Sequence, residues 1–270
     1  MRLRIAHSIH LRYEPPASGV IQVLRLTPRN HEGQYVVGWR IDVSADARLN
    51  AHEDAFGNLS HVFTADGPLD ALTIRVDGEV ETQNTEGVVH GTLERFPPSL
   101  FLRDTPLTQA DSAIQDFAND IRKAGAETTL GRLHALMQRL HDETAGERDT
   151  PHATTTTATA AEVFAHKCGG SRDLAHVFIG AAHCLGVPAR YVAGYFCTGG
   201  VLEQDSDHAW AEAFVSDLGW VGFDPINCLC PTEAYVRVAV ALDAFGAAPV
   251  RGTRYGLGEE TAAVAIKIDQ

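Results

Sequence analysis

The sequence lacks any long apolar run. No stretch approaches the ~20 consecutive apolar residues of a membrane-spanning helix, and the start, MRLRIAHSIHLRY, has no apolar core of signal-peptide length. Basic residues are also scarce, with 22 Lys and Arg against 35 Asp and Glu, so the net charge is −13. A phosphate backbone would be repelled by such a chain. We therefore expect a cytoplasmic protein that binds neither membranes nor nucleic acid.

Cysteines are few, and the first half of the chain has none. Their number is odd, which does not suit a disulfide framework, so we expect reduced thiols at Cys168, Cys184, Cys197, Cys228 and Cys230. The last two resemble half of a zinc clip, but a second pair at suitable spacing is missing. We predict no metal and no organic cofactor. With 44% hydrophobic and 21% charged residues, the chain has the composition of a globular protein.

The first hundred residues alternate between apolar and polar side chains and are rich in β-branched residues. This pattern is clearest at Arg2 to Ile5, Tyr35 to Val43 and Leu72 to Val76. Turn sequences such as Phe56-Gly57-Asn58 and Asp77-Gly78 separate the alternating stretches. The pattern predicts a β-sandwich domain over residues 1–100.

The remainder, residues 101–270, mixes helical and strand-like segments. Apolar residues at three- and four-residue steps predict helices at Ala110–Lys123, Thr129–Thr144, Ala160–Phe164 and Ser171–Leu185. A threonine-rich run, Thr150–Thr157, reads as a loop. Strands are predicted at Ala189–Tyr195, His208–Val215, Trp220–Asp224, Val236–Val240 and Ala262–Ile268. This order predicts an α+β domain with helices packed on an antiparallel sheet, and the last strand could return to a sheet already built.

One glycine-rich turn, KCGGSRDLAH (167–176), runs directly into a predicted helix and places Ser171 at its mouth. The unpaired N–H groups and the dipole at a helix N-terminus can activate a thiol or hold an oxyanion. Two consecutive strands carry His208 and Asp224, so a carboxylate could orient the imidazole toward the helix mouth, as in an acyl-transfer triad. Each residue also has an ordinary structural explanation: Ser171 as a helix cap, His208 as a packed strand residue and Asp224 as part of a turn.

The sequence around these residues resembles that of the transglutaminase-like cysteine protease superfamily. The resemblance rests on segments found in order along the chain: FLRDTPLT (101–108), the glycine turn, LGVPARYVAGY (185–195), DHAWAE (207–212) and LGWVGFDP (218–225). Bacterial members join a β-rich N-terminal domain to a papain-like transglutaminase core. The resemblance implies that His208 and Asp224 are the catalytic histidine and aspartate, and that Ser171 occupies the position of the family's cysteine.

The implied chemistry is thiolate attack on a peptide or protein amide through an acyl-enzyme. No acidic calcium loop is visible, which favours a peptidase or amidase over a cross-linking enzyme. A serine hydroxyl is far less acidic than a thiol, so we expect the chain as written to be inactive or very slow. Three explanations remain open: a cysteine-to-serine replacement, which the intact His208 and Asp224 favour; a natural pseudoenzyme serving as a peptide-binding or scaffolding module; and a serine amidase.

Four neighbours of the predicted triad are candidate substrate-binding residues: Arg172, Asp173, Tyr191 and Trp210. A surface ion pair is the alternative for Arg172, and a core position is the alternative for Trp210. Cys168 is an alternative nucleophile, although it lies three residues before the helix mouth and reads better as a loop thiol near the site.

Overall fold

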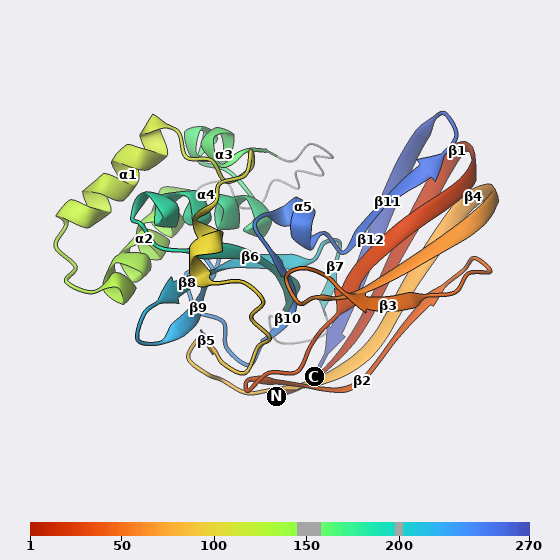
Figure 1. The fold of residues 1–270 in the computed structure, drawn as a ribbon, viewed down its shortest axis with the longest axis horizontal. Coiled ribbons are helices and arrows are strands. Elements are labelled where there is room, and N and C mark those ends of the chain that lie inside the picture. Colours follow the sequence, from red (N-terminus) through yellow and green to blue (C-terminus); the bar gives the residue numbers. More distant parts are fainter. Residues whose placement is uncertain (145–157, 198–201) are drawn as a thin grey trace.

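A computed structural model describes residues 1–144, 158–197 and 202–270 of the chain. Figure 1 shows a helical half, built around a central sheet, beside a half made of long strands, with the two chain ends close together. The loop predicted at Thr150–Thr157 lies outside the described residues. None of the helices in these three ranges is long and apolar enough to cross a bilayer.

The strand-rich half is one antiparallel sheet. In the described residues its path is β2-β4-β1-β12-β7, with β11 also paired to β1 and β3 to β4. The strands are β1 (Arg2–Thr27), β2 (Gln34–Val43), β3 (Asn50–Glu53), β4 (Leu59–Thr82), β7 (Leu202–Gln204), β11 (Val250–Tyr255) and β12 (Glu259–Asp269). Because β11 and β12 come from the C-terminus and pair with β1, the end of the chain completes the sheet that the N-terminus begins.

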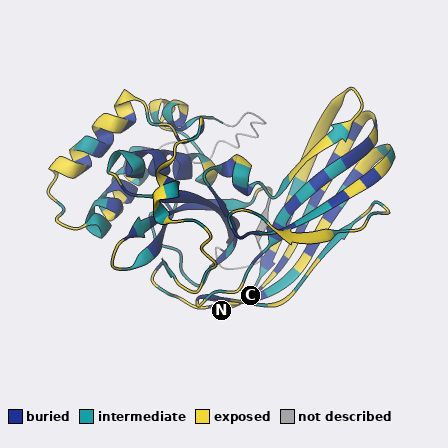
Figure 2. Cartoon of the chain, viewed as in Figure 1, coloured by how far each residue is buried: buried dark blue, intermediate teal, exposed yellow. Residues whose placement is uncertain are grey.

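Strand β1 bends near its middle. Its buried positions are odd-numbered up to Tyr13 and even-numbered from Val20 onward, and the register with β4 shifts between Arg12 and Ala17. Both halves of β1 line the same apolar core. A single bent sheet therefore surrounds the core for which the sequence predicts a β-sandwich. Alternating dark and light bands along the strands in Figure 2 show this pattern. The predicted class, a mixed fold with a strand-rich N-terminal region, is confirmed.

The helical half is built on a second antiparallel sheet, with the order β10-β6-β8-β9-β5 in the described residues. Its strands are β5 (Val88–Val89), β6 (Ala189–Phe196), β8 (His208–Val215), β9 (Gly219–Phe223) and β10 (Tyr235–Ala241). Strands β8 and β9 are neighbours, with Ala211 opposite Phe223. This pairing brings the start of β8 close to the chain that leaves β9.

Helices pack against this sheet, and their ends follow the sequence closely (Figure 1). They are η1 (Pro98–Leu102), α1 (Ser112–Lys123), α2 (Thr129–Thr144), α3 (Ala160–His166), α4 (Ser171–Cys184) and α5 (Ala244–Ala247). Asp111 caps α1 by accepting a hydrogen bond from the Ile114 N–H, and Thr159 with Glu162 forms a capping box on α3. Helix α4 is buried from Leu174 to Ala182 and lies directly on β8, so it is the central helix of this half.

Candidate active site

Helix α4 places Ser171 at its first turn. The preceding residue, Gly170, has extended backbone angles, and its N–H donates to the Asp173 carboxylate at 3.0 Å. The Ser171 hydroxyl oxygen accepts a hydrogen bond from the Ala209 N–H at 3.3 Å. The side chain at position 171 therefore lies between the N-terminus of a buried helix and the start of β8.

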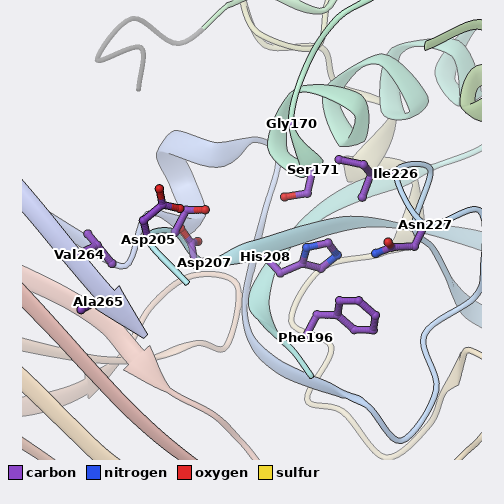
Figure 3. Close-up of a pocket in the computed structure, with 11 residues that line it drawn as sticks. Gly170, Ser171, Phe196, Asp205, Asp207, His208, Ile226, Asn227, Val264 and Ala265 are labelled. Atoms are coloured by element: carbon purple, nitrogen blue, oxygen red, sulfur yellow. The ribbon is translucent and has the colours of Figure 1, made fainter. Parts of the chain in front are cut away.

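His208 and Asp224 form a hydrogen-bonded pair. Strand β8 begins at His208, and Asp224 follows the last residue of β9. The His208 Nε2 atom lies 2.7 Å from Asp224 Oδ2, and the ring packs against Phe196 with centroids 5.2 Å apart. With Nε2 held by the carboxylate, Nδ1 is the ring nitrogen left to exchange a proton with a group at position 171. Figure 3 shows Ser171 and His208 projecting into the same space.

The Asp224 carboxylate is fully buried and surrounded by donors. Besides His208, its Oδ2 accepts hydrogen bonds from the Tyr235 hydroxyl at 2.7 Å and the Asn227 amide at 2.8 Å, while Oδ1 accepts from the Ile226 N–H at 3.1 Å. Burial alone would raise the pKa of Asp224, but the hydrogen bond and charge of His208, with the donors on Tyr235 and Asn227, hold it below its ordinary value. The carboxylate is therefore kept ionised beside the imidazole.

These residues open onto a cleft of about 740 Å³. Its lining residues come from the α4 turn, from the end of β6, from β8 and the segment before it, from the turn after β9 and from β12: Gly170, Ser171, Phe196, Asp205, Ser206, Asp207, His208, Ile226, Asn227, Val264 and Ala265. Figure 3 shows the last two on the strand opposite His208. Both halves of the molecule thus contribute walls to the cleft.

The two predicted binding residues that follow Ser171 have different surroundings. The Asp173 side chain is occupied in bonding the Gly170 N–H. The Arg172 side chain is 45% exposed, and its guanidinium lies 3.7 Å from the carboxylate of Asp207, which lines the cleft. Burial raises the pKa of Asp207 although the charges of Arg172 and His208 act in the opposite direction. Arg172 therefore acts on the cleft through Asp207.

The predicted substrate-binding roles of Tyr191 and Trp210 do not fit their positions. Neither residue lines the cleft, and each side chain is 2% exposed. Burial raises the pKa of Tyr191 far above its ordinary value, and its hydroxyl bonds Arg172. Trp210 packs in an apolar cluster with Val192 and Tyr235. Tyr191 packs beside His176 of α4, with ring centroids 5.2 Å apart. Trp210 lies on the same face of β8 as His208, with ring centroids 6.3 Å apart, but it is buried in the apolar cluster and does not reach the cleft surface.

The cysteines considered as alternatives lie elsewhere. Cys168 is in the turn before α4 and does not line the cleft. Cys228 and Cys230 follow the Asp224 turn, where burial raises the pKa of Cys230 to about 11. Within the described ranges, no group of three His, Cys, Asp or Glu side chains is arranged to hold a metal ion.

Sequence reasoning missed several residues of the site. Tyr235 and Asn227 both donate hydrogen bonds to Asp224, Phe196 packs on His208, and Asp207 forms an ion pair with Arg172 at 3.7 Å. Asn227 could have been suspected from its place just after Asp224-Pro225, because short polar side chains commonly form local hydrogen bonds in turns. Tyr235 has no such signal, because it reaches Asp224 from β10, two strands away from β8 in the sheet.

Comparison with known sequence families matches two segments of the chain. Residues 3–81 match the bacterial transglutaminase-like N-terminal region, and residues 115–225 match the transglutaminase-like superfamily. The second segment contains Ser171, His208 and Asp224. The two matches fall on the strand-rich half and on the helical half of the molecule, respectively.

Individual proteins resemble the chain along most of its length. The protein ML0607 of Mycobacterium leprae is 27% identical over 283 residues, which cover 99% of this chain and 98% of that protein. A crystal structure described as a "Putative Cysteine Protease" from Cytophaga hutchinsonii is similar with a TM-score of 0.78 and 18% identity, covering 100% of this chain and 90% of that one. The latter shows that the two proteins share a fold.

Proposed function

We propose, from the premise that this chain joins a bacterial transglutaminase-like N-terminal region to a transglutaminase-like core, that its cleft is built for thiol-type acyl transfer at a peptide or protein amide. One observation carries the proposal: the N-terminus of α4, with Ser171, shares a cleft with a His208 imidazole that is fixed by a buried carboxylate. This combination is what a thiolate at position 171 would need.

The steps follow from these positions. A thiolate at position 171 attacks the amide carbonyl carbon, and the oxyanion that forms is stabilised by N–H groups at the mouth of α4. His208, protonated at Nδ1, gives that proton to the departing amine as the C–N bond breaks. His208 then takes a proton from water or an acceptor amine, which attacks the thioester carbon; the C–S bond breaks and the thiolate and the protonated His208 are restored. Asp224 orients the ring throughout.

The hydroxyl of Ser171 does not suit this chemistry. A serine hydroxyl must lose its proton during attack, whereas a site that stabilises a thiolate and an imidazolium has the charges separated beforehand. We propose that the chain as it stands is an inactive or very slow form, with a serine at the nucleophile position. The intact His208–Asp224 pair favours this explanation over a genuine serine amidase.

The second candidate function is a peptide-binding module that has lost turnover. Retention of an open cleft of about 740 Å³ beside a serine favours it. The two candidates differ in what restoring the thiol would do. Ser171→Cys creates a fast hydrolase if only the nucleophile is altered, and it creates no such activity in a module that has diverged for binding.

The test is the rate of iodoacetamide alkylation at position 171 in Ser171→Cys, from about pH 5 to 9, which brackets the ordinary thiol pKa. The modified peptide is followed by mass spectrometry, so the other cysteines do not interfere. Ser206→Cys is a matched control, because Ser206 is exposed in the same cleft but is not on α4. Adding His208→Ala to the first variant removes the imidazole.

We expect rapid labelling of Ser171→Cys well below the ordinary thiol pKa, loss of that labelling with His208→Ala, and an ordinary thiol profile for Ser206→Cys. An ordinary profile in both cysteine variants would overturn the proposed chemistry. Rapid labelling without amide hydrolysis would favour the binding module.

A further inference from the structure

One edge of β12 is unpaired beside the cleft. Residues Glu259 to Asp269 of β12 pair with β1 along one edge, but on the other edge β7 pairs only with Ile266, Lys267 and Ile268. Within the residues that the structure describes, no strand pairs with that second edge from Glu259 to Ala265. The backbone N–H and C=O groups of alternate residues there point outward and can bond another extended chain.

Beyond Glu259 and Glu260, which are charged, this edge lacks the features that usually protect a strand edge. Proteins block exposed edges with charged side chains, proline, bulges or a covering segment, because an open edge pairs with other chains. The stretch from Thr261 to Ala265 reads TAAVA, with no charge and no proline, and four of its five residues are exposed. Its side chains are small, so they leave room for an approaching backbone.

The edge strand of the other sheet shows the contrast. On β10, the Gln34 side chain bonds the N–H and the C=O of Arg237, and the Asn58 side chain bonds the N–H and the C=O of Val240. Each carboxamide thereby takes the place of a neighbouring strand. Because this fold covers the edge of β10 at two points, the open edge of β12 is a specific feature of that place in the molecule.

The open edge leads into the cleft. Val264 and Ala265 line the same cleft as Ser171 and His208, and Figure 3 shows them on β12 across from those residues, with Asp205 and Asp207 between. The pairing of β7 with β12 ends where Gln204 lies opposite Ile266, and Ile266 directly follows the cleft residue Ala265 on β12. An added strand that continues the line of β7 would therefore enter the cleft directly.

We propose that the β12 edge from Glu259 to Ala265 binds an extended segment of the substrate polypeptide as an additional strand, next to β7, and so directs its amide toward position 171. This inference rests on the proposed function, since it names how the substrate of that cleft is held. Main-chain hydrogen bonds supply the affinity, and every second side chain of the substrate faces the same side of the sheet. The substrate class is accordingly an unfolded or extended polypeptide segment.

The first test uses the chain with Ser171, in which we expect little or no turnover of a bound peptide. The probe is the blocked heptapeptide acetyl-Thr-Val-Thr-Gln-Val-Thr-Val-amide, compared with versions that carry one N-methyl group at each position in turn. We expect hydrogen exchange of the amides between Glu259 and Ala265 to slow when the peptide binds. Affinity should fall about tenfold or more for N-methylation at alternate positions and change little at the positions between, because alternate N–H groups face β12.

A second test changes the edge itself. Ala262→Pro and Ala263→Pro remove adjacent N–H groups, of which one bonds β1 and the other faces outward. The variant that removes the outward-facing N–H should keep nearly the same thermal unfolding temperature. In that variant the peptide should no longer slow hydrogen exchange of the β12 amides. Alkylation of the same proline variants with Ser171→Cys checks that the catalytic pair is intact, and we expect no change in that rate.

Three results would overturn the inference while leaving the proposed chemistry in place. One is peptide binding without protection of β12 and without alternation in the N-methyl series. Another is no binding of the probe at millimolar concentration while Ser171→Cys is labelled rapidly. The third is protection of β12 without peptide in a sample that sediments as a dimer, which would assign the edge to a second copy of the chain. Slow labelling of Ser171→Cys would instead identify failure of the proposed function.

Discussion

The Tyr235 hydroxyl donates a hydrogen bond to Asp224 Oδ2, the same oxygen that lies 2.7 Å from His208 Nε2. The carboxylate thus receives a hydrogen bond from β10 as well as from β8. Burial raises the pKa of Asp224, but these donors and the charge of His208 outweigh burial and hold the pKa below its ordinary value. Strand β10, at the edge of the sheet, therefore contributes to the ionisation state of the His208–Asp224 pair.

Tyr235→Phe should move the acid limb of thiol labelling in Ser171→Cys to higher pH. Without the hydroxyl, Asp224 loses one donor and its pKa rises, so it is protonated earlier as pH falls and stops supporting the imidazolium. A hydrogen bond of ~1 kcal/mol corresponds to a shift of about one pH unit or less. The labelling profile from about pH 3 to 7 measures it. Tyr35→Phe, at a 58% exposed tyrosine, is the control, and equal profiles in both variants would contradict the prediction.

Glu212→Gln should destabilise the fold strongly. Glu212 is fully buried on β8 between Arg190 and Arg237, with N···O distances of 2.7 Å to each. Burial alone would raise its pKa, but the two guanidinium groups lower it to about 2. Removing the charge takes the carboxylate away from the buried Arg237 and leaves the buried Arg190 paired with Glu94, which costs about 3–5 kcal/mol. Urea unfolding at neutral pH measures the loss. Glu79→Gln, which breaks a surface pair with Arg2, should cost far less, because solvent screens exposed charges.

The same carboxylate gives a pH test. A folded pKa below the unfolded one contributes stability above the unfolded value, and this is lost as pH falls from 4.5 toward about 2. Glu212→Gln should therefore flatten the decline of unfolding free energy in that window. If its pH dependence matched that of the parent protein there, the assignment of Glu212 would be contradicted.

Most of the helical half could be predicted from sequence because its elements carry local signals. Apolar spacing and capping residues predict α1 to α4, and β6, β8, β9 and β10 lie within two residues of their predicted bounds. The short elements β5, β7 and α5 were not predicted, since a few residues do not show a period. Pairing of β11 and β12 with β1 depends on contacts across more than two hundred residues, which local pattern does not specify.

The site shows the same division. Ser171, His208 and Asp224 could be predicted as candidates because each stands at a boundary of an element with a recognisable sequence around it. For Tyr191 and Trp210, a strand pattern does not tell how deeply a side chain is buried: Trp210 shares the face of β8 that carries His208, yet both residues are 2% exposed. No sequence pattern indicates that Val264 and Ala265 line the cleft. They reach it only because β12, near the C-terminus, pairs with β1, near the N-terminus.

Two buried histidines should make the fold sensitive to mild acid. Burial lowers the pKa of His7 and of His176 from 6.5 to about 4. Between these values the unfolded chain binds the proton and the folded chain does not, so stability falls as pH drops from 6.5 to 4, by ~1.4 kcal/mol per pH unit for each histidine. His176→Gln, whose oxygen can accept from the Ala244 N–H as His176 Nε2 does, should reduce that slope by about one proton. The exposed His10→Gln is the control, and an unchanged slope in His176→Gln would contradict the prediction.

Asn58→Ala should cost far more than an asparagine substitution at the surface. The Asn58 side chain accepts from the Val240 N–H at 2.8 Å and donates to the Val240 C=O at 2.7 Å, so its removal leaves two backbone groups of β10 without their partners. Each buried group left unsatisfied costs about 1–3 kcal/mol, and we expect a total of about 2–4 kcal/mol in urea unfolding. The matched control is Asn30→Ala, since Asn30 accepts one exposed hydrogen bond from the Val36 N–H and should cost about 1 kcal/mol or less. Similar losses in the two variants would mean that water replaces the carboxamide on β10, and that the edge of β10 is less protected than its hydrogen bonds indicate.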